Sequence, residues 1–202
     1  MTLSLFKKVK HIFSTFFKSD QLNAIILITF EYLFKEKRIK LEELKFFEKQ
    51  ANAIDYINKK KLDLIKEKDL ANYGNIQGLH ELIFNYLSGK DINIFDSLKD
   101  LNIDLNMNKK FPTAFSLSVI NKLANLNRGE ITTYSEIGSK IGSRAYRAIG
   151  NVLRKNPLPL IIPCHRVIKK NGEIGGFMGE SDESWQQNLK RNLLEIEQIT
   201  NP

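Results

Sequence analysis

Around its single cysteine the chain reads Ile161-Ile162-Pro163-Cys164-His165-Arg166-Val167-Ile168. One thiol can form neither an internal disulfide nor a zinc site with several cysteines, so Cys164 is either a structural side chain or a reagent. A histidine and an arginine follow it directly. A cationic neighbourhood lowers the pKa of a thiol from about 8.5 toward neutrality, and the thiolate is the nucleophile. The setting therefore favours a reactive cysteine.

The structural alternative rests on burial and on backbone geometry. Free cysteines are among the most buried residues, and an arbitrary Cys-His pair is usually structural. On an extended backbone Cys164 and His165 point to opposite faces, so they interact only if the chain bends or a water bridges them. Pro163 argues against a regular central strand and favours a bend. The pair alone leaves both interpretations open.

The bulk composition suits one large domain or two modest ones, with 42% hydrophobic residues among 202. The net charge of +8 is unevenly spread. Residues 1–106 carry 17 basic and 15 acidic side chains, whereas residues 107–202 carry 14 and 8. This excess in the second half indicates a polyanionic partner such as nucleic acid, with a solvated basic face as the alternative.

The lone cysteine fits a reducing, cytoplasmic compartment. The longest apolar stretches fall short of 18 residues, so we expect no membrane partner. Apolar residues recur at helical spacing within residues 1–20, interrupted by lysines. This pattern predicts an amphipathic basic helix rather than a signal peptide, packed against the following domain or touching a membrane surface.

The first half reads as mixed strand and helix. Branched and aromatic residues at 22–30 predict a buried strand, and residues 35–70 are assigned loosely as strand and helix. Residues 78–87 predict a short helix. Residues 91–110, rich in Asn and Asp, are expected to connect two lobes.

The second half predicts helices with clear caps. Thr113 is a candidate N-cap for a helix ending near Arg128-Gly129, and Thr133-Tyr134-Ser135-Glu136 fits a capping box. Gly142 stops that second helix, and Ser143 can cap a third. The third helix is expected to bury Ala145, Ile149, Val152 and Leu153. Its opposite side carries Arg144, Arg147, Asn151, Arg154 and Lys155. Stacked like charges cost stability unless an anion neutralises them, so a DNA-reading helix-turn-helix is at least as good an explanation as a solvated face.

Three motifs, in order and spacing, resemble the O6-alkylguanine-DNA alkyltransferases, also called methylated-DNA–protein-cysteine methyltransferases. They are Arg147-Ala148-Ile149-Gly150, Asn156-Pro157-Leu158-Pro159 and Ile162-Pro163-Cys164-His165-Arg166-Val167. The resemblance is strong over about residues 111–197 and looser in the first half, chiefly at 80–96. It implies an α/β (α+β) fold. A ribonuclease-H-like N-terminal lobe with a small sheet and helix spans 1–106, and a mainly helical DNA-binding and alkyl-acceptor domain spans 107–202.

The resemblance also implies a function, which is DNA repair by direct damage reversal. An alkyl group on O6 of guanine, with O4 of thymine as a second source, passes irreversibly to Cys164, so each molecule acts once. The damaged base is first extruded from double-stranded DNA bound through the minor groove. We expect a monomer with no cofactor and no metal.

The resemblance assigns roles residue by residue. Cys164 is the nucleophile, His165 deprotonates it through a water, and Glu197 orients the imidazole. Tyr134 donates to guanine N3 and neutralises the leaving base, while Asn156 ties the DNA-binding helix to the cysteine loop. Arg147 is the wedge that replaces the extruded base. The other expected DNA contacts are Arg144, Ala148, Asn151 and Arg154, with Tyr134 beside the phosphate.

The substrate pocket is expected at the glycine-rich stretch 172–179, in which a purely structural turn is the alternative. A P-loop is excluded because no lysine follows in the required spacing. The expected pocket residues are Val167, Phe177, Met178 and Gly179. Met178 stands where the family often has a hydroxyl residue, and Tyr146 stands where small residues are usual.

Two other functions compete with repair. A damage sensor of the alkyltransferase-like type binds lesions without chemistry, but it carries another residue at the cysteine position. A cysteine hydrolase needs a distant histidine and an oxyanion site, and the chain has only His11, His80 and His165.

Overall fold

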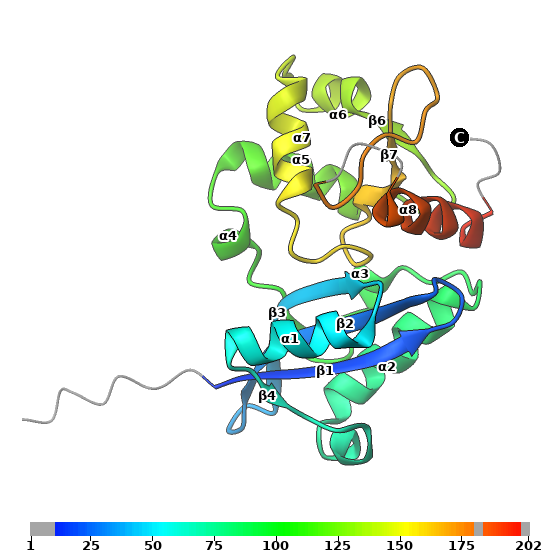
Figure 1. Ribbon diagram of the computed structural model, residues 1–202. Helices are drawn as coiled ribbons and strands as arrows, with labels where there is room; N and C mark the ends of the chain where they lie inside the picture. Colours follow the sequence, from blue (N-terminus) through cyan, green and yellow to red (C-terminus); the bar gives the residue numbers. More distant parts are fainter. Residues whose placement is uncertain (1–10, 180–183, 199–202) are drawn as a thin grey trace, which may run out of the picture.

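The computed structural model describes residues 11–179 and 184–198, which form two lobes (Figure 1). The N-terminal lobe holds the five-stranded sheet and the helices beside it. The C-terminal lobe, which follows the last strand of that sheet, is mainly helical. The mixed α/β architecture expected from the sequence is therefore confirmed.

The sheet is an antiparallel meander extended by one short strand at each side. Strands β1 (Ile12–Ser19), β2 (Ala24–Leu33) and β3 (Arg38–Phe47) pair in sequence order. Strand β4 (Asp63–Leu64) pairs parallel to β1, and β5 (Ile103–Asp104) pairs parallel to β3. Strand β2 confirms the strand predicted at 22–30, and it lies at the centre of the sheet.

The helix predicted for residues 1–20 is wrong where the structure can be compared with it. Residues 12–19 form β1, which pairs with β2 along its whole length. Isoleucine, threonine and phenylalanine dominate this segment, and they fit a pleated surface better than a helix. Residues 1–10 of the prediction lie outside the described residues.

Helices account for the burial of β2. Helix α2 (Gly74–Leu87) buries Leu79 and Ile83 in the same cluster as Ile26 and Ile28 of β2. Helix α1 (Gln50–Lys60) contacts β2 and β3 and buries Ala53 and Ile57 outside that cluster. Covering both faces explains why β2 reads as a continuous apolar run rather than an alternating one.

The predicted connector contains short elements of its own. Within residues 91–110, α3 (Ile94–Ser97) and α4 (Met107–Lys110) flank β5, whereas the 3₁₀ helix of residues 67–72 lies outside the connector, before α2. The segment 91–110 does link the lobes, but it also adds β5 to the sheet. Asn102 and Asn106 of this segment have positive φ angles, which asparagine adopts more readily than most other residues.

The C-terminal lobe confirms the caps predicted at Thr113 and Thr133, but the cap predicted at Ser143 is wrong, because the third helix begins after Ala145 and no side chain caps it. Thr113 and Ser116 form a capping box at α5 (Ala114–Ala124), which ends earlier than predicted. Thr133 and Glu136 form a second one at α6 (Tyr134–Lys140). Gly142 has the positive φ expected of a helix stop. Helix α7 (Tyr146–Arg154) follows, and α8 (Trp185–Ile196) closes the lobe beside a small parallel sheet of β6 (Thr132–Thr133) and β7 (Val167–Ile168).

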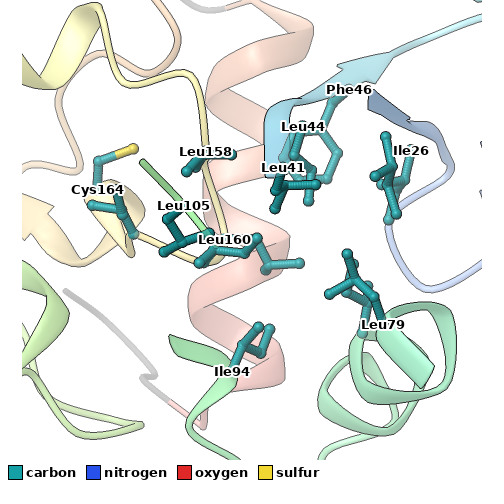
Figure 2. Packing of buried hydrophobic residues seen from close by; sticks show 14 of the residues in the cluster. Ile26, Leu41, Leu44, Phe46, Leu79, Ile94, Leu105, Leu158, Leu160 and Cys164 are labelled. Carbon is teal, nitrogen blue, oxygen red and sulfur yellow. The ribbon is translucent and has the colours of Figure 1, made fainter. Parts of the chain in front are cut away.

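One apolar cluster joins the lobes. Leu41 and Leu44 of β3 belong to the same cluster as Leu158 and Leu160, which lie in the loop before Cys164 (Figure 2). The backbone N–H of Leu44 donates to the carbonyl of Pro157 at 2.9 Å. This loop, yellow after α7 in Figure 1, is therefore fixed by the N-terminal lobe as well as by its own.

Candidate active site

The cysteine lies in a bend, as Pro163 predicts. Residues Cys164–Arg166 form a single 3₁₀ turn, in which the N–H of Arg166 donates to the carbonyl of Pro163 at 3.0 Å. The chain then enters β7. Because the backbone bends here, the rule that neighbouring side chains of an extended strand point to opposite faces does not apply to Cys164 and His165. Cys164 is 8% exposed and lines a pocket, whereas His165 is fully buried.

Asn156 connects the end of α7 to the sulfur. Its side-chain N–H₂ donates to Cys164 Sγ at 3.3 Å and to the carbonyl of Ile162 at 3.0 Å. Its Oδ1 accepts from the N–H of Leu158 at 3.0 Å. The side chain of Asn156 therefore links the end of α7 to the cysteine loop.

The electrostatics of the thiol differ from the expectation. Burial raises the pKa of Cys164, and the hydrogen bond from Asn156 and the charge of Lys190 offset that rise only in part. The adjacent Arg166 does not supply the expected cation to the sulfur, because its guanidinium binds Glu197. The resting thiol is therefore protonated, and forming the thiolate requires a base.

The imidazole of His165 is bound through one ring nitrogen only. Its Nε2 lies 2.7 Å from Glu197 Oε1. Because a carboxylate only accepts, Nε2 carries the hydrogen and Nδ1 keeps a free lone pair. Among the described residues Nδ1 is buried with no hydrogen-bond partner. Burial lowers the pKa of His165 despite the opposing effect of Glu197, so the imidazole is neutral.

Glu197 is the centre of a buried ion cluster. Arg166 Nε donates to its Oε2 at 2.9 Å, and the N–H of Gly129 donates to the same oxygen at 3.3 Å. Burial raises the pKa of this carboxyl, but His165 and Arg166 outweigh it and hold the pKa well below its usual range. Glu197 is therefore a permanent anion at the end of α8.

A pocket of about 240 Å³ opens over the sulfur. Its lining comprises Tyr134, Gly150, Leu153, Arg154, Cys164 and residues 176–179. The predicted Phe177, Met178 and Gly179 are thus at the pocket, whereas Val167 is buried and is not among the lining residues. Tyr134 is half-buried, burial raises its pKa, and a thiolate at Cys164 would raise it further, so its phenol remains a donor.

Lys190 is a residue of this site that sequence reasoning missed. It is completely buried on α8, and its Nζ donates to the carbonyls of Val167 and Ile174 at 2.6 Å each. Burial lowers its pKa to about 8. The ammonium thereby joins the strand after Cys164 to the pocket loop. The sequence does contain a signal for this residue. Lys190 lies on the same apolar stripe as Leu189 and Leu193, which indicates a buried lysine.

Tyr86 is the second missed residue, and it comes from the other lobe. Its hydroxyl, in the last turn of α2, donates to Glu197 Oε1 and lies 3.4 Å from His165 Nε2. It is separated from these partners by 79 and 111 positions, and no sequence spacing signals that contact.

Helix α7 exposes most of the predicted basic side. Its exposed residues and those just before it include Arg144, Arg147, Asn151 and Arg154, with Ala148 half-buried between them. Ile149 and Leu153 face the core as predicted, but Ala145 is exposed because it is only the N-cap of the helix. Ser143 accepts from the N–H of Ala145 at 3.1 Å.

Tyr146 is accommodated within the helix-turn-helix. A side chain at Gly138 would approach the Tyr146 ring within 2.7 Å and the carbonyl of Ser143 within 2.5 Å. The bulky ring therefore packs over Gly138 of α6, and the glycine is required for this close turn.

Within residues 11–179 and 184–198, no group of three or more potential ligand side chains is arranged to hold a metal ion. No helix in these ranges is long and apolar enough to cross a membrane.

Sequence comparison identifies relatives over most of this region. The family model described as "6-O-methylguanine DNA methyltransferase, DNA binding domain" matches residues 114–199. A methylated-DNA–protein-cysteine methyltransferase of Metallosphaera sedula is 38% identical over 138 residues, covering 67% of this chain and 78% of the relative. The enzyme of the same name from Saccharolobus islandicus is 40% identical over 117 residues, covering 58% and 66%.

Solved structures share the fold over nearly the whole chain. The O6-methylguanine methyltransferase of Mycobacterium tuberculosis aligns with a TM-score of 0.63 at 22% identity, covering 95% of both chains. The protein from Pyrococcus kodakaraensis aligns with a TM-score of 0.60 at 19% identity, covering 91% of this chain and 98% of that one. A complex of the M. tuberculosis protein with DNA aligns with a TM-score of 0.58.

Proposed function

Because this chain belongs to the methylated-DNA–protein-cysteine methyltransferase family, we propose that it repairs DNA by taking an alkyl group from guanine O6 onto Cys164. One observation carries the assignment of Cys164. The only thiol of the chain lines a pocket at the foot of a basic helix, beside a buried neutral imidazole with a free Nδ1. A structural cysteine needs neither the pocket nor the base.

The chemistry follows from the protonated thiol. His165 Nδ1 takes the proton of Cys164 through one water, and the charge of Glu197 stabilises the imidazolium that results. The thiolate then attacks the alkyl carbon, a C–S bond forms, and the C–O bond to the purine breaks. The leaving guanine is an anion, which Tyr134 stabilises by donating to N3. Return of the proton from His165 completes a neutral guanine.

Two side chains hold the reacting sulfur in the pocket. Asn156 donates to Sγ in the resting protein and fixes the loop through Ile162 and Leu158. Lys190 lies buried behind the loop and favours the anionic sulfur, since its charge lowers the pKa of Cys164. These contacts partly compensate the burial that otherwise disfavours the thiolate.

DNA is bound through α7 in this proposal, from the minor groove. Arg147 is the wedge that fills the space of the extruded base, an extrusion that costs a few kcal/mol. Arg144, Asn151 and Arg154 supply further contacts from the same exposed side, and Ala148 permits close approach. The net charge of +6 over residues 107–202 supports a polyanion on this lobe.

The pocket sets the substrate. Phe177 provides an apolar wall, Met178 cannot donate to O6, and backbone groups of Cys164 and Val167 read the exocyclic amine. O4-alkylthymine is a second substrate in this proposal.

The protein acts as a monomer with a boundary between domains near residue 106. Because a thioether has no ordinary leaving step, each molecule reacts once.

A stoichiometric transfer assay tests the proposal. The chain is mixed with an excess of duplex DNA carrying labelled O6-methylguanine, and label on the protein is counted. We expect one equivalent per active chain, no label on Cys164→Ala, and DNA binding by both proteins. Binding without transfer by the wild-type chain, as a damage sensor would give, contradicts the proposal.

A further inference from the structure

We propose that Tyr86 of the N-terminal lobe is a positioning residue for the transfer reaction, which makes that lobe a working part of the active site. Its phenol holds Glu197, and through Glu197 the imidazole of His165, in the orientation that leaves Nδ1 free for the thiol. The inference rests on the proposed function and extends it to a residue outside the DNA-binding domain.

The placement of Tyr86 is the first support. The side chain is 1% exposed at the C-terminal end of α2, and its hydroxyl enters the cluster of His165, Arg166 and Glu197. A buried hydroxyl needs a hydrogen-bond partner, but that need alone could be met by any nearby carbonyl. Instead the phenol donates to the one oxygen of Glu197 that the imidazole also binds.

Arg128 fixes the tyrosine from the C-terminal lobe. Its guanidinium carbon lies 4.6 Å from the centroid of the Tyr86 ring, and its Nη1 donates to the backbone carbonyl of Tyr86 at 3.2 Å. Its Nη2 donates to the carbonyl of Ile196, the residue before Glu197. One arginine thus joins the end of α2 to the end of α8, so the phenol and the carboxylate are held in register.

Both carboxylate oxygens accept from several donors. Oε2 accepts from Arg166 Nε and Gly129, while Oε1 accepts from His165 and Tyr86 and also from Arg166, through Nη2 at 3.0 Å and Nε at 3.2 Å. A donor shared at Oε1 fixes the plane of the carboxylate. It also draws charge from the oxygen that stabilises an imidazolium, so His165 stays a neutral base.

The charged and titratable groups acting on His165 come from three elements. Lys190 lies on α8 and Glu197 directly after it. Arg166 lies in the cysteine turn, and Tyr86 lies on α2. Removing the phenol leaves the three charges in place. Oε1 then binds the imidazole more strongly, and protonation of His165 becomes easier.

Tyr86→Phe tests the inference because it removes the hydroxyl and keeps the packing. The single-turnover rate of methyl transfer from O6-methylguanine duplex to excess protein is measured across the pH range in which histidine titrates. We expect the rate constant to fall about tenfold at neutral pH, in line with loss of a hydrogen bond to a charged group. The acid limb of the profile should move to higher pH.

Tyr56→Phe is the matched control. Its phenol also donates to a carboxylate, Glu43 at 2.5 Å, but on α1 and β3, away from His165 and Glu197. This variant should keep the wild-type rate and pH profile. Thermal unfolding of both variants shows whether either loses its fold.

Two results would overturn the inference alone. One is a Tyr86→Phe protein with the wild-type rate and profile, and the other is a slower protein whose acid limb has not moved. Failure of the wild-type chain to accept the methyl group would instead overturn the proposed function, and this inference with it.

Discussion

The two lobes contribute different things to one site. The C-terminal lobe supplies the thiol, the imidazole, the carboxylate and the basic side of α7. The N-terminal lobe is nearly neutral, and it supplies apolar packing from β3 and the single phenol of Tyr86. In the proposed mechanism, therefore, the residues that react and a residue that holds them come from different lobes.

The largest expected effect concerns the buried carboxylate of the C-terminal lobe. Glu197→Gln removes the partner of Arg166 and the acceptor of His165, so transfer should fall by about a hundredfold or more. Breaking a buried ion pair should also cost about 3–5 kcal/mol of stability. Single-turnover assays and chemical denaturation check both. A near-normal transfer rate would place the chemistry elsewhere.

The same carboxylate gives the pH dependence of stability. Folding depresses the pKa of Glu197 from the ordinary 4.5, so its contribution is fully present above that pH. The contribution is lost as pH falls below about 4.5 toward the folded pKa. Wild-type stability should therefore drop in acid more steeply than that of Glu197→Gln, and parallel curves would contradict the assignment.

A smaller effect is expected from the wedge. Arg147→Ala should slow transfer from duplex DNA about tenfold or more, because the extruded base is no longer replaced. Reaction with the free base O6-methylguanine needs no extrusion and should be unchanged. Rates on the two substrates check this, and equal loss on both would refute the wedge role.

The smallest expected effect tests the difference in charge between the two lobes. Arg144→Gln removes an exposed cation beside α7 and should reduce the salt dependence of DNA affinity by about one phosphate contact. The matched change in the N-terminal lobe, Lys59→Gln, should leave affinity and salt slope unaltered. Titrations at several salt concentrations measure both variants. A larger effect of Lys59→Gln would indicate that DNA binds to the N-terminal lobe instead.

Sequence reasoning was most successful where structure is local. The N-cap at Thr113, the capping box at Thr133, the stop at Gly142 and the bend at Pro163 each depend on neighbours within a few positions, and each is present. The motifs around Asn156 and Cys164 likewise lie within one loop, so their contact could be anticipated.

The failures share a dependence on distant partners. Residues 12–19 have apolar spacing that also fits a helix, and only pairing with β2 decides for a strand. The pKa of Cys164 was expected to be low from its neighbours in sequence, but burial by the whole fold raises it. Tyr86 reaches Glu197 across 111 positions, and one sequence carries no sign of such a contact.

Locating the methyl group tests the central claim most directly. The wild-type chain is incubated with O6-methylguanine duplex, digested, and mapped by mass spectrometry. The account predicts one added methyl group per reacted chain, confined to the peptide that contains Cys164. A methyl group on another residue, or repaired DNA with Cys164 unmodified, would contradict it.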